Sequence, residues 1–361
     1  MRIPVCEPLL IGNEAKYVLD CLQTGWISSA GGYLDRFEQG FADYCDREYG
    51  VAATNGTTAL HLALASLGVG KGDEVILPTF TIISCALAVL YTGAKPVFVD
   101  CDPDTFNIDV TKIEDKITLR TKAIMPVHLY GHPCDMLAIQ QIAGIYDLKV
   151  VEDAAEAHGS EIAGKKAGGF SDVGCFSFYA NKIITTGEGG MLTTNNRNIA
   201  DRARSLRNLA HSNVRFVHNE IGFNYRMTNI QAALGLAQLE NIDLFVDLRR
   251  KHAHRYTEAL RELPVKTPVE MPGYKNSYWM YTLLLADKAT RDGLIRYLAE
   301  REIETRTFFI PMHQQPILNC QGEFPVADNI SERGLYLPSG TGLTDSQIDR
   351  ICGTIQDYFG R

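Results

Sequence analysis

The chain has 361 residues, 45% of them hydrophobic and 22% charged, which is the composition of a globular protein with a large core. The formal net charge of −8 argues against a nucleic-acid-binding protein, which would carry a basic surface. No apolar run is long enough to span a bilayer, and the first residues lack the apolar core of a signal peptide. We therefore expect a soluble cytoplasmic protein without nucleic-acid or membrane partners.

The cysteines and histidines indicate no metal centre. The nine cysteines are scattered and include no CxxC pair, so the sequence predicts free thiols in place of disulfides or a thiolate metal site. The spacing of histidines and carboxylates matches no zinc motif such as HExxH. We expect no bound metal.

Short β-rich runs alternate with helical patterns over the first 195 residues. The apolar and β-branched runs predict strands at 50–54, 74–77, 96–99, 123–128, 149–152, 174–179 and 190–194. Helical spacing predicts connecting helices at 58–67, 82–91 and 136–146. This alternation is typical of crossover units that build a mostly parallel sheet covered by helices.

The last third of the chain has a different pattern. An Ala-, Leu- and Gln-rich helical region is predicted over 228–262, and a proline-rich stretch over 264–272 follows it. Beyond this stretch the patterns predict a small α+β unit, with strands and helices at 278–285, 290–302, 304–309 and 344–359. The predicted organisation is a large α/β domain over 1–263, which includes an N-terminal arm and the long linking helix, and a small C-terminal domain over 264–361.

The most informative segment surrounds a lysine, in Ser177-Phe-Tyr-Ala-Asn-Lys182-Ile-Ile-Thr-Thr-Gly187. Two apolar strands flank Lys182 and would hold it at the end of a sheet. Partial burial there would lower the pKa of the amine and make it a nucleophile toward an aldehyde. The alternative for a lysine at a sheet edge is an ion-pairing role.

Two polar motifs follow predicted strands, and the carboxyl ends of parallel strands meet at one edge of a sheet. Gly56, Thr57 and Thr58 open a helix directly after a strand, where free N–H groups can bind an anion. Asp153 ends another strand and could pair with a protonated pyridine nitrogen, and Glu156 could face the same pocket. A helix cap is the alternative for both motifs.

Three further side chains complete a cofactor set. Phe80 follows the strand at 74–77 and could stack on an aromatic ring, with core packing as the alternative. Ser177 could donate a hydrogen bond to a phosphate, and Asn224 lies in a loop before the long helix. A Schiff-base lysine, a phosphate cup, a carboxylate at a ring nitrogen and a stacking aromatic ring are what pyridoxal phosphate requires, so the sequence predicts this cofactor.

In these motifs the chain resembles the fold-type-I pyridoxal-phosphate enzymes, and within them the DegT/DnrJ/EryC1/StrS family of sugar aminotransferases. The similarity covers nearly the whole chain and includes Gly25-Trp-Ile-Ser-Ser29, Asn55-Gly-Thr-Thr-Ala-Leu60, Pro126-Val-His-Leu-Tyr-Gly131 and Asn224-Tyr-Arg-Met-Thr-Asn229. The resemblance implies the α/β fold of aspartate aminotransferase, with a large mostly parallel sheet and a smaller C-terminal α+β domain.

The resemblance also implies roles for the residues that face the cofactor ring. Lys182 would hold the cofactor covalently and move the proton between substrate and cofactor. Asp153 would pair with the ring nitrogen, and Phe80 would stack on the ring. Glu156 would meet the phenolic oxygen, at a position where many relatives carry Gln.

By the same resemblance, the phosphate of the cofactor would be held by Gly56, Thr57 and Ser177, with Thr58 beside them. Asn224 would reach the phosphate bound in a neighbouring subunit. The resemblance therefore implies a homodimer with shared active sites, and it leaves open whether dimers pair into tetramers.

Relatives that dehydrate sugars carry His in place of Lys182, so the lysine favours transamination. Within the family, the chain resembles a subgroup whose members move an amino group from L-glutamate to C4 of GDP-4-keto-6-deoxy-D-mannose. The product would be GDP-perosamine, for O-antigen or another surface polysaccharide. Ser29 and His313 would contact the hexose, and Arg226 the diphosphate.

Three alternatives stay open at this point. The keto sugar could be linked to UDP or dTDP, because variable loops that one sequence does not decode recognise the nucleobase. A non-catalytic regulator would lack Lys182 or carry a DNA-binding segment, and neither is seen. Another pyridoxal-phosphate reaction would need an arginine clamp on a substrate carboxylate, which the sequence does not single out.

Overall fold

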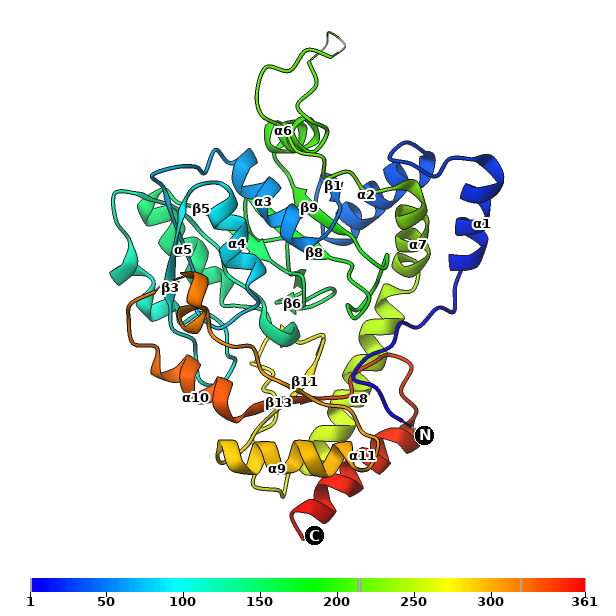
Figure 1. Cartoon of the computed structure of the whole chain (residues 1–361), viewed down its shortest axis with the longest axis vertical. Helices are drawn as coiled ribbons and strands as arrows, with labels where there is room; N and C mark the ends of the chain where they lie inside the picture. The colour runs from blue at the N-terminus through cyan, green and yellow to red at the C-terminus, as the bar shows by residue number, and fades with distance from the viewer. Residues whose placement is uncertain (1, 213, 215, 319, 361) are drawn as a thin grey trace.

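The computed structural model describes residues 2–212, 214, 216–318 and 320–360, and a seven-stranded sheet forms its centre (Figure 1). The strand order is β1-β9-β8-β5-β4-β2-β3, with β1 Tyr49–Ala53, β2 Glu74–Pro78, β3 Lys95–Val99, β4 Thr121–Ile124, β5 Lys149–Asp153, β8 Val173–Ser177 and β9 Gly190–Thr194. Strands β3, β2, β4, β5 and β8 pair in parallel, whereas β9 is antiparallel to both of its neighbours. The predicted large, mostly parallel sheet is confirmed.

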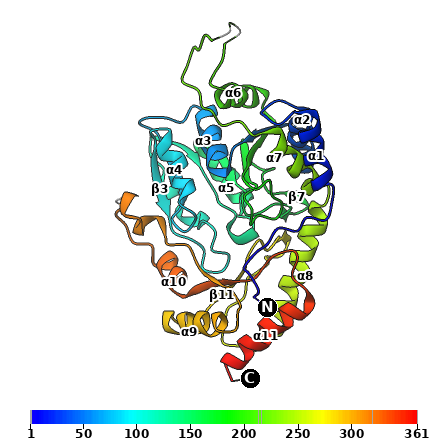
Figure 2. The ribbon, with the colours of Figure 1, turned by 45° about the vertical axis from the view of Figure 1, so that its right-hand side comes forward.

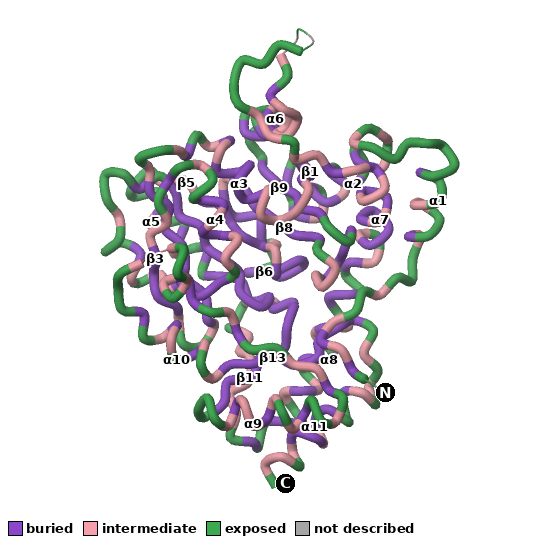
Figure 3. Tube along the Cα trace, in the orientation of Figure 1, coloured by how far each residue is buried: buried purple, intermediate pink, exposed green. Residues whose placement is uncertain are grey.

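Helices cover this sheet, and most residues of its strands are buried (Figure 3). Helix α3 (Gly56–Ser66) contacts β8, β9, α4 (Ser84–Tyr91) and α6 (Arg197–Arg207), while α5 (Met136–Tyr146) contacts β4 and β5. Helix α2 (Gly32–Tyr44) packs on β1 and on α7 (Asn229–Leu239), which also contacts α1 (Glu14–Thr24). Strands covered in this way read as continuous apolar runs, which is why the sequence pattern located them.

A second unit lies at the end of the molecule where both termini are found (Figures 1 and 2). Its sheet has the order β11-β13-β12, and its elements are β11 Tyr281–Leu284, α9 Lys288–Ala299, β12 Arg306–Thr307, α10 Pro325–Arg333, β13 Gly334–Leu337 and α11 Asp345–Tyr358. The core of this unit also contains Ile3 and, from the end of α8 (Ile242–Leu260), Tyr256 and Leu260. The predicted domain boundary after residue 263 therefore follows a helix whose last turns pack into the second core.

The structure corrects several predicted elements. The single helix expected over 228–262 is two helices, because Asn241 (φ −118°, ψ 11°) leaves the helical conformation between α7 and α8. Strand β4 ends at Ile124, before Pro126, which has no N–H to donate. A small third sheet, β10-β6-β7, was not predicted; it consists of β6 Glu161–Ile162, β7 Lys165–Lys166 and β10 Tyr274–Lys275. Within the described ranges, no helix combines the length and apolarity needed to cross a membrane.

A buried carboxylate fixes the carboxyl end of β5. Glu152 is fully buried, and its oxygens accept three backbone N–H groups and one hydroxyl from the loop 168–171 at 2.7–2.9 Å. His128 Nε2 lies 3.0 Å from the same carboxylate. Because Glu152 precedes Asp153, this network sets the position of the candidate site residue that follows.

We expect Glu152→Ala to lower the free energy of unfolding by about 3–5 kcal/mol, because buried N–H donors would lose their acceptor. Urea unfolding followed by circular dichroism measures this change. Glu258→Ala is the matched control, since that carboxylate is 73% exposed and pairs with Arg261 at the surface. Equal stabilities of the two variants would contradict the role given to Glu152.

Candidate active site

A cavity of about 490 Å³ lies at the carboxyl ends of β1, β5 and β8. The structure brings six of the residues predicted from the sequence into its wall, namely Gly56, Thr57, Asp153, Glu156, Ser177 and Lys182. They come from three separate segments, and the parallel sheet places these segments at one edge.

Lys182 lies in the connection between β8 and β9. Its amine is 3.8 Å from Glu156 Oε1 and 3.8 Å from the centre of the Trp279 ring, and its side chain is only 11% exposed. Burial lowers the pKa of the Lys182 amine, against the opposing attraction of the Glu156 and Asp153 carboxylates. A larger share of this amine is therefore unprotonated and nucleophilic than of a lysine in water.

The N-terminus of α3 forms an anion cup beside the lysine. Asn55 Oδ1 accepts the Thr58 N–H at 2.9 Å, and Thr58 Oγ1 accepts the Asn55 N–H at 3.1 Å, so Thr58 serves as part of the helix cap. The N–H groups of Gly56 and Thr57 belong to the first turn of the helix, where N–H groups have no acceptor within the helix, and both residues line the cavity. A Cβ on Gly56 would lie 2.8 Å from the Ser177 Cβ, so glycine is what allows α3 and β8 to approach this closely.

The Asp153 carboxylate is 3% exposed and accepts two hydrogen bonds. Ala155 N–H donates to Oδ1 at 3.1 Å, and the Cys85 thiol donates to Oδ2 at 3.0 Å. Burial and the neighbouring carboxylate raise the pKa of Cys85 well above its ordinary value, so the thiol stays a donor. Cys85, on α4, has no motif of its own, and the sequence analysis did not identify it.

Glu156 lies between Lys182 and the backbone of Tyr130, whose N–H donates to Oε2 at 2.8 Å. Burial raises the pKa of Glu156 to about 7, although Lys182 and the Tyr130 N–H both lower it. At neutral pH the side chain therefore exists in both its protonated and ionised forms.

The structure does not bring Phe80 to the cavity. Its ring is fully buried among other aromatic rings, with Phe308 at 5.8 Å and Tyr130 at 6.4 Å between centroids. Ile82, two residues later, lines the cavity and is 39% exposed. The position of Phe80 corresponds to the core-packing alternative, and an apolar side chain at the cofactor face would come from Ile82.

The predicted substrate contacts lie elsewhere. Ser29 and Arg226 line a separate hollow of about 330 Å³, together with Arg204 and Arg207. His313 lies between the two units, with Nδ1 2.8 Å from Thr79 Oγ1.

Asn224 is exposed and lies in the loop before α7, outside the lysine cavity of its own chain. Its Oδ1 accepts a hydrogen bond from Arg226 at 2.7 Å.

Several residues that line the cavity were missed by the sequence analysis. Trp279, Phe309 and Tyr336 reach it from the last third of the chain, more than ninety residues after Lys182. The sequence analysis assigned these aromatic residues no role at the site, because their contact with it depends on how the second unit packs on the sheet.

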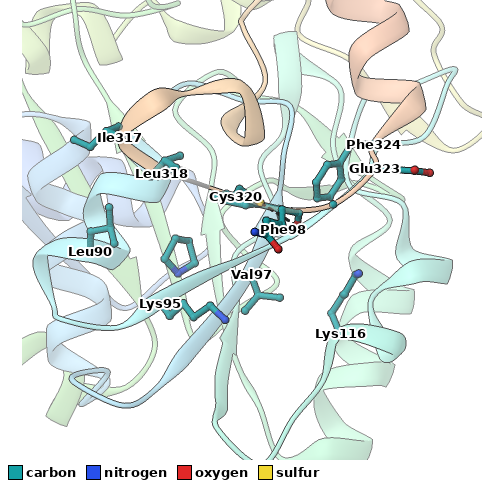
Figure 4. Close-up of a pocket in the computed structure, with 13 residues that line it drawn as sticks. Leu90, Lys95, Val97, Phe98, Lys116, Ile317, Leu318, Cys320, Glu323 and Phe324 are labelled. Carbon is teal, nitrogen blue, oxygen red and sulfur yellow. Dashed lines mark hydrogen bonds between the residues drawn. The ribbon is translucent and has the colours of Figure 1, made fainter.

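A second hollow of about 490 Å³ lies between β3 and the segment that precedes α10 (Figure 4). Its charged lining groups include Lys95 and Lys116, both exposed, and apolar side chains such as Phe98 and Phe324 form much of the rest. It contains no buried carboxylate, so we assign the chemistry to the Lys182 cavity. In the ranges that the structure describes, no cluster of His, Cys, Asp and Glu could hold a metal ion.

The Lys182 cavity has the groups that pyridoxal phosphate requires. The cup at Gly56, Thr57 and Ser177 suits a phosphate, Lys182 suits the aldehyde, and Asp153 suits a protonated ring nitrogen. The fold and this site define an enzyme that uses pyridoxal phosphate.

Comparison with known proteins gives the family. The profile of the DegT/DnrJ/EryC1/StrS aminotransferase family matches residues 8–356, and the chain belongs to this family. The GDP-perosamine synthases of Caulobacter vibrioides and Escherichia coli O157:H7 are 48% and 45% identical to it, each over 99% of this chain and 98% of its own length. The crystal structure of DesV from S. venezuelae superposes with a TM-score of 0.92 at 36% identity, over 97% of this chain and 95% of its own. The protein is thus a pyridoxal-phosphate-dependent aminotransferase.

We expect Glu156→Gln to change how stability depends on pH in the cofactor-free protein. The folded chain keeps a proton on Glu156 up to about pH 7, whereas the unfolded chain releases it near 4.5. Wild type should therefore lose stability relative to the variant as pH rises through this window, on the order of 1 kcal/mol per pH unit.

Urea unfolding at several pH values between 4.5 and 8 measures this difference. Glu188→Gln is the control, because that carboxylate also lines the cavity but is exposed. Parallel pH profiles of wild type and Glu156→Gln would show that Glu156 titrates alike in the folded and unfolded chains.

Proposed function

We propose that this enzyme transfers an amino group from L-glutamate to C4 of GDP-4-keto-6-deoxy-D-mannose and so forms GDP-perosamine. The supporting observation is the full-length similarity to GDP-perosamine synthases of two bacteria. The product would serve O-antigen or other surface-polysaccharide synthesis. The lysine cavity supports the amino transfer, and the relatives support the choice of sugar nucleotide.

Pyridoxal phosphate would supply a carbonyl that carries the amino group and a ring that accepts electron density from the reacting carbon. Gly56, Thr57 and Ser177 would hold its phosphate, and Asp153 would keep its ring nitrogen protonated. Lys182 would bind the cofactor and then move the proton at the reacting carbon, because its amine is buried and burial lowers its pKa.

We propose a homodimer in which each subunit completes the site of the other. Lys182 is the one cationic side chain among the described residues that line its cavity, whereas a sugar nucleotide carries a diphosphate. Arg226 and Asn224 lie on the outside of the same chain, where they could serve a neighbouring subunit. Exposed apolar side chains, Trp26 at 59% and Ile221 at 86%, support association between copies.

We propose the cytoplasm as the location of this reaction. All the cysteines are free thiols, in keeping with a reducing compartment.

The first test incubates the enzyme with pyridoxal phosphate, L-glutamate and GDP-4-keto-6-deoxymannose, and detects GDP-perosamine by mass spectrometry. We expect product with the GDP sugar, and we expect Lys182→Ala to lower kcat by about a thousandfold or more because the proton carrier is lost. Parallel reactions with UDP- and dTDP-linked 4-keto-6-deoxyglucose complete the assay. Product from one of these alone would replace the proposed substrate, and absence of any aminated sugar would refute the proposed reaction.

The second test mixes Lys182→Ala and Asn224→Ala, two variants that we expect to be inactive alone, after subunit exchange. If Asn224 serves the neighbouring subunit, each mixed dimer contains one intact site. Because about half of the dimers are mixed, activity should return to about a quarter of the wild-type value. Self-mixed samples of each variant are the controls. No recovery, with mixed dimers demonstrated by native mass spectrometry, would show that Asn224 acts within its own chain.

A further inference from the structure

Trp279 contacts the Lys182 turn in two ways. Its indole N–H donates to the Asn181 carbonyl at 2.8 Å, and its ring lies under the Lys182 amine at 3.8 Å. The side chain is 96% buried and lines the cavity, although it comes from the segment just before β11. A single residue thus holds both the backbone and the amine of the lysine turn.

Two further residues, Arg249 and Tyr130, fix the position of Trp279. Arg249, on α8, is 2% exposed and donates to the Trp279 carbonyl through one guanidinium nitrogen and to the Lys182 carbonyl through the other, the latter at 3.4 Å. Tyr130 lies nearly parallel to the indole, with 13° between the rings and 6.4 Å between their centroids. The indole therefore has little freedom to move away from the amine.

We propose that Trp279 is the positioning residue for Lys182, with its ring face as the resting place of the amine when that amine is not bonded to the cofactor. The assignment of catalysis to Lys182 rests on the proposed function, whereas the contact between the two side chains does not. A lysine that moves a proton must return to one defined place, and a ring face attracts an ammonium group there.

The charged groups around the amine act together with the ring. The Glu156 and Asp153 carboxylates attract the ammonium form, Arg249 repels it, and the buried Cys85 thiol is neutral. Burial opposes the charge as well, so the ring face is one of the few features that favour the ammonium form. Its removal should shift the ionisation of Lys182 to lower pH.

The test measures how fast acetic anhydride labels Lys182 as a function of pH, in the full-length protein without cofactor and with the amine form of the cofactor bound. Peptide mass spectrometry reads the labelling, with exposed Lys122 as an internal standard. The midpoint of the pH profile reports ionisation, and the plateau at high pH reports access. For Trp279→Leu we expect the midpoint of the profile to move to lower pH. At pH values below the midpoint, we expect Lys182 to be labelled about three- to tenfold faster than in wild type, after correction for any difference in the plateau rate.

Two variants separate the ring face from general packing. Trp279→Phe keeps a ring without the indole N–H, so its midpoint should stay near that of wild type. Phe308→Leu removes another buried aromatic ring that touches Tyr130 but not Lys182, and should leave the midpoint unchanged. A wild-type midpoint in Trp279→Leu, or the same shift in Trp279→Phe, would overturn the proposal.

Steady-state kinetics then tests the consequence for catalysis. Loss of positioning should lower kcat of Trp279→Leu by about tenfold with little change in KM, because the amine moves the proton but does not bind the sugar. If the labelling shift is present and no substrate is aminated by wild type, the proposed function fails while the positioning role stands.

Discussion

The site depends on one constraint, which is the burial of the Lys182 amine. Lys182 has to remain a nucleophile and a proton carrier, and both need a pKa below that of a solvated lysine. Its side chain is 11% exposed, so the surrounding groups decide its ionisation. Glu156 and the Trp279 ring favour the charged form, whereas burial favours the neutral one. This opposition leaves the amine able to gain and lose a proton.

Two parts of the chain form the site, and each contributes a different kind of side chain. The sheet edge supplies the polar groups, because β1, β5 and β8 end together and their following residues meet there. The last third supplies aromatic walls, including Trp279 and Tyr336. Arg249 joins the two through its bonds to the carbonyls of Trp279 and Lys182. Chemistry at the sheet edge is thereby coupled to the packing of the second unit.

The sequence predicted the polar half of this site and most of the central sheet, and the reason is local. Lys182, Asp153 and the turn at Gly56 each lie at or within a few residues of the end of an apolar strand, so strand ends and polar motifs coincide in the printed sequence. Cys85 and Trp279 escaped prediction because a thiol within a helix and a tryptophan before a strand look like core residues. Phe80 was placed at the cofactor for its aromatic character, but aromatic neighbours from the second unit enclose it.

The same local reasoning failed for α7 and α8. A run of good helix formers over 228–262 contains no proline or glycine at the break, so propensity alone cannot show that the chain turns at Asn241. The turn matters because α7 packs on the sheet side with α2, whereas the end of α8 enters the second core. The position of the break depends on packing against two different cores, because the sequence of the helix itself does not mark it.

The charge of the cavity finally bears on how an anionic substrate would be held. Asp153, Glu156 and Glu188 line it beside Lys182, so its acidic side chains outnumber its basic one. The N-terminus of α3 can neutralise one phosphate, which the cofactor itself would occupy. A nucleotide diphosphate would therefore need cations from outside this cavity. The hollow at Arg204, Arg207 and Arg226 has them, and the lysine of its own chain does not line it. The proposed exchange of residues between two subunits is the arrangement that would bring both sets of groups to one substrate.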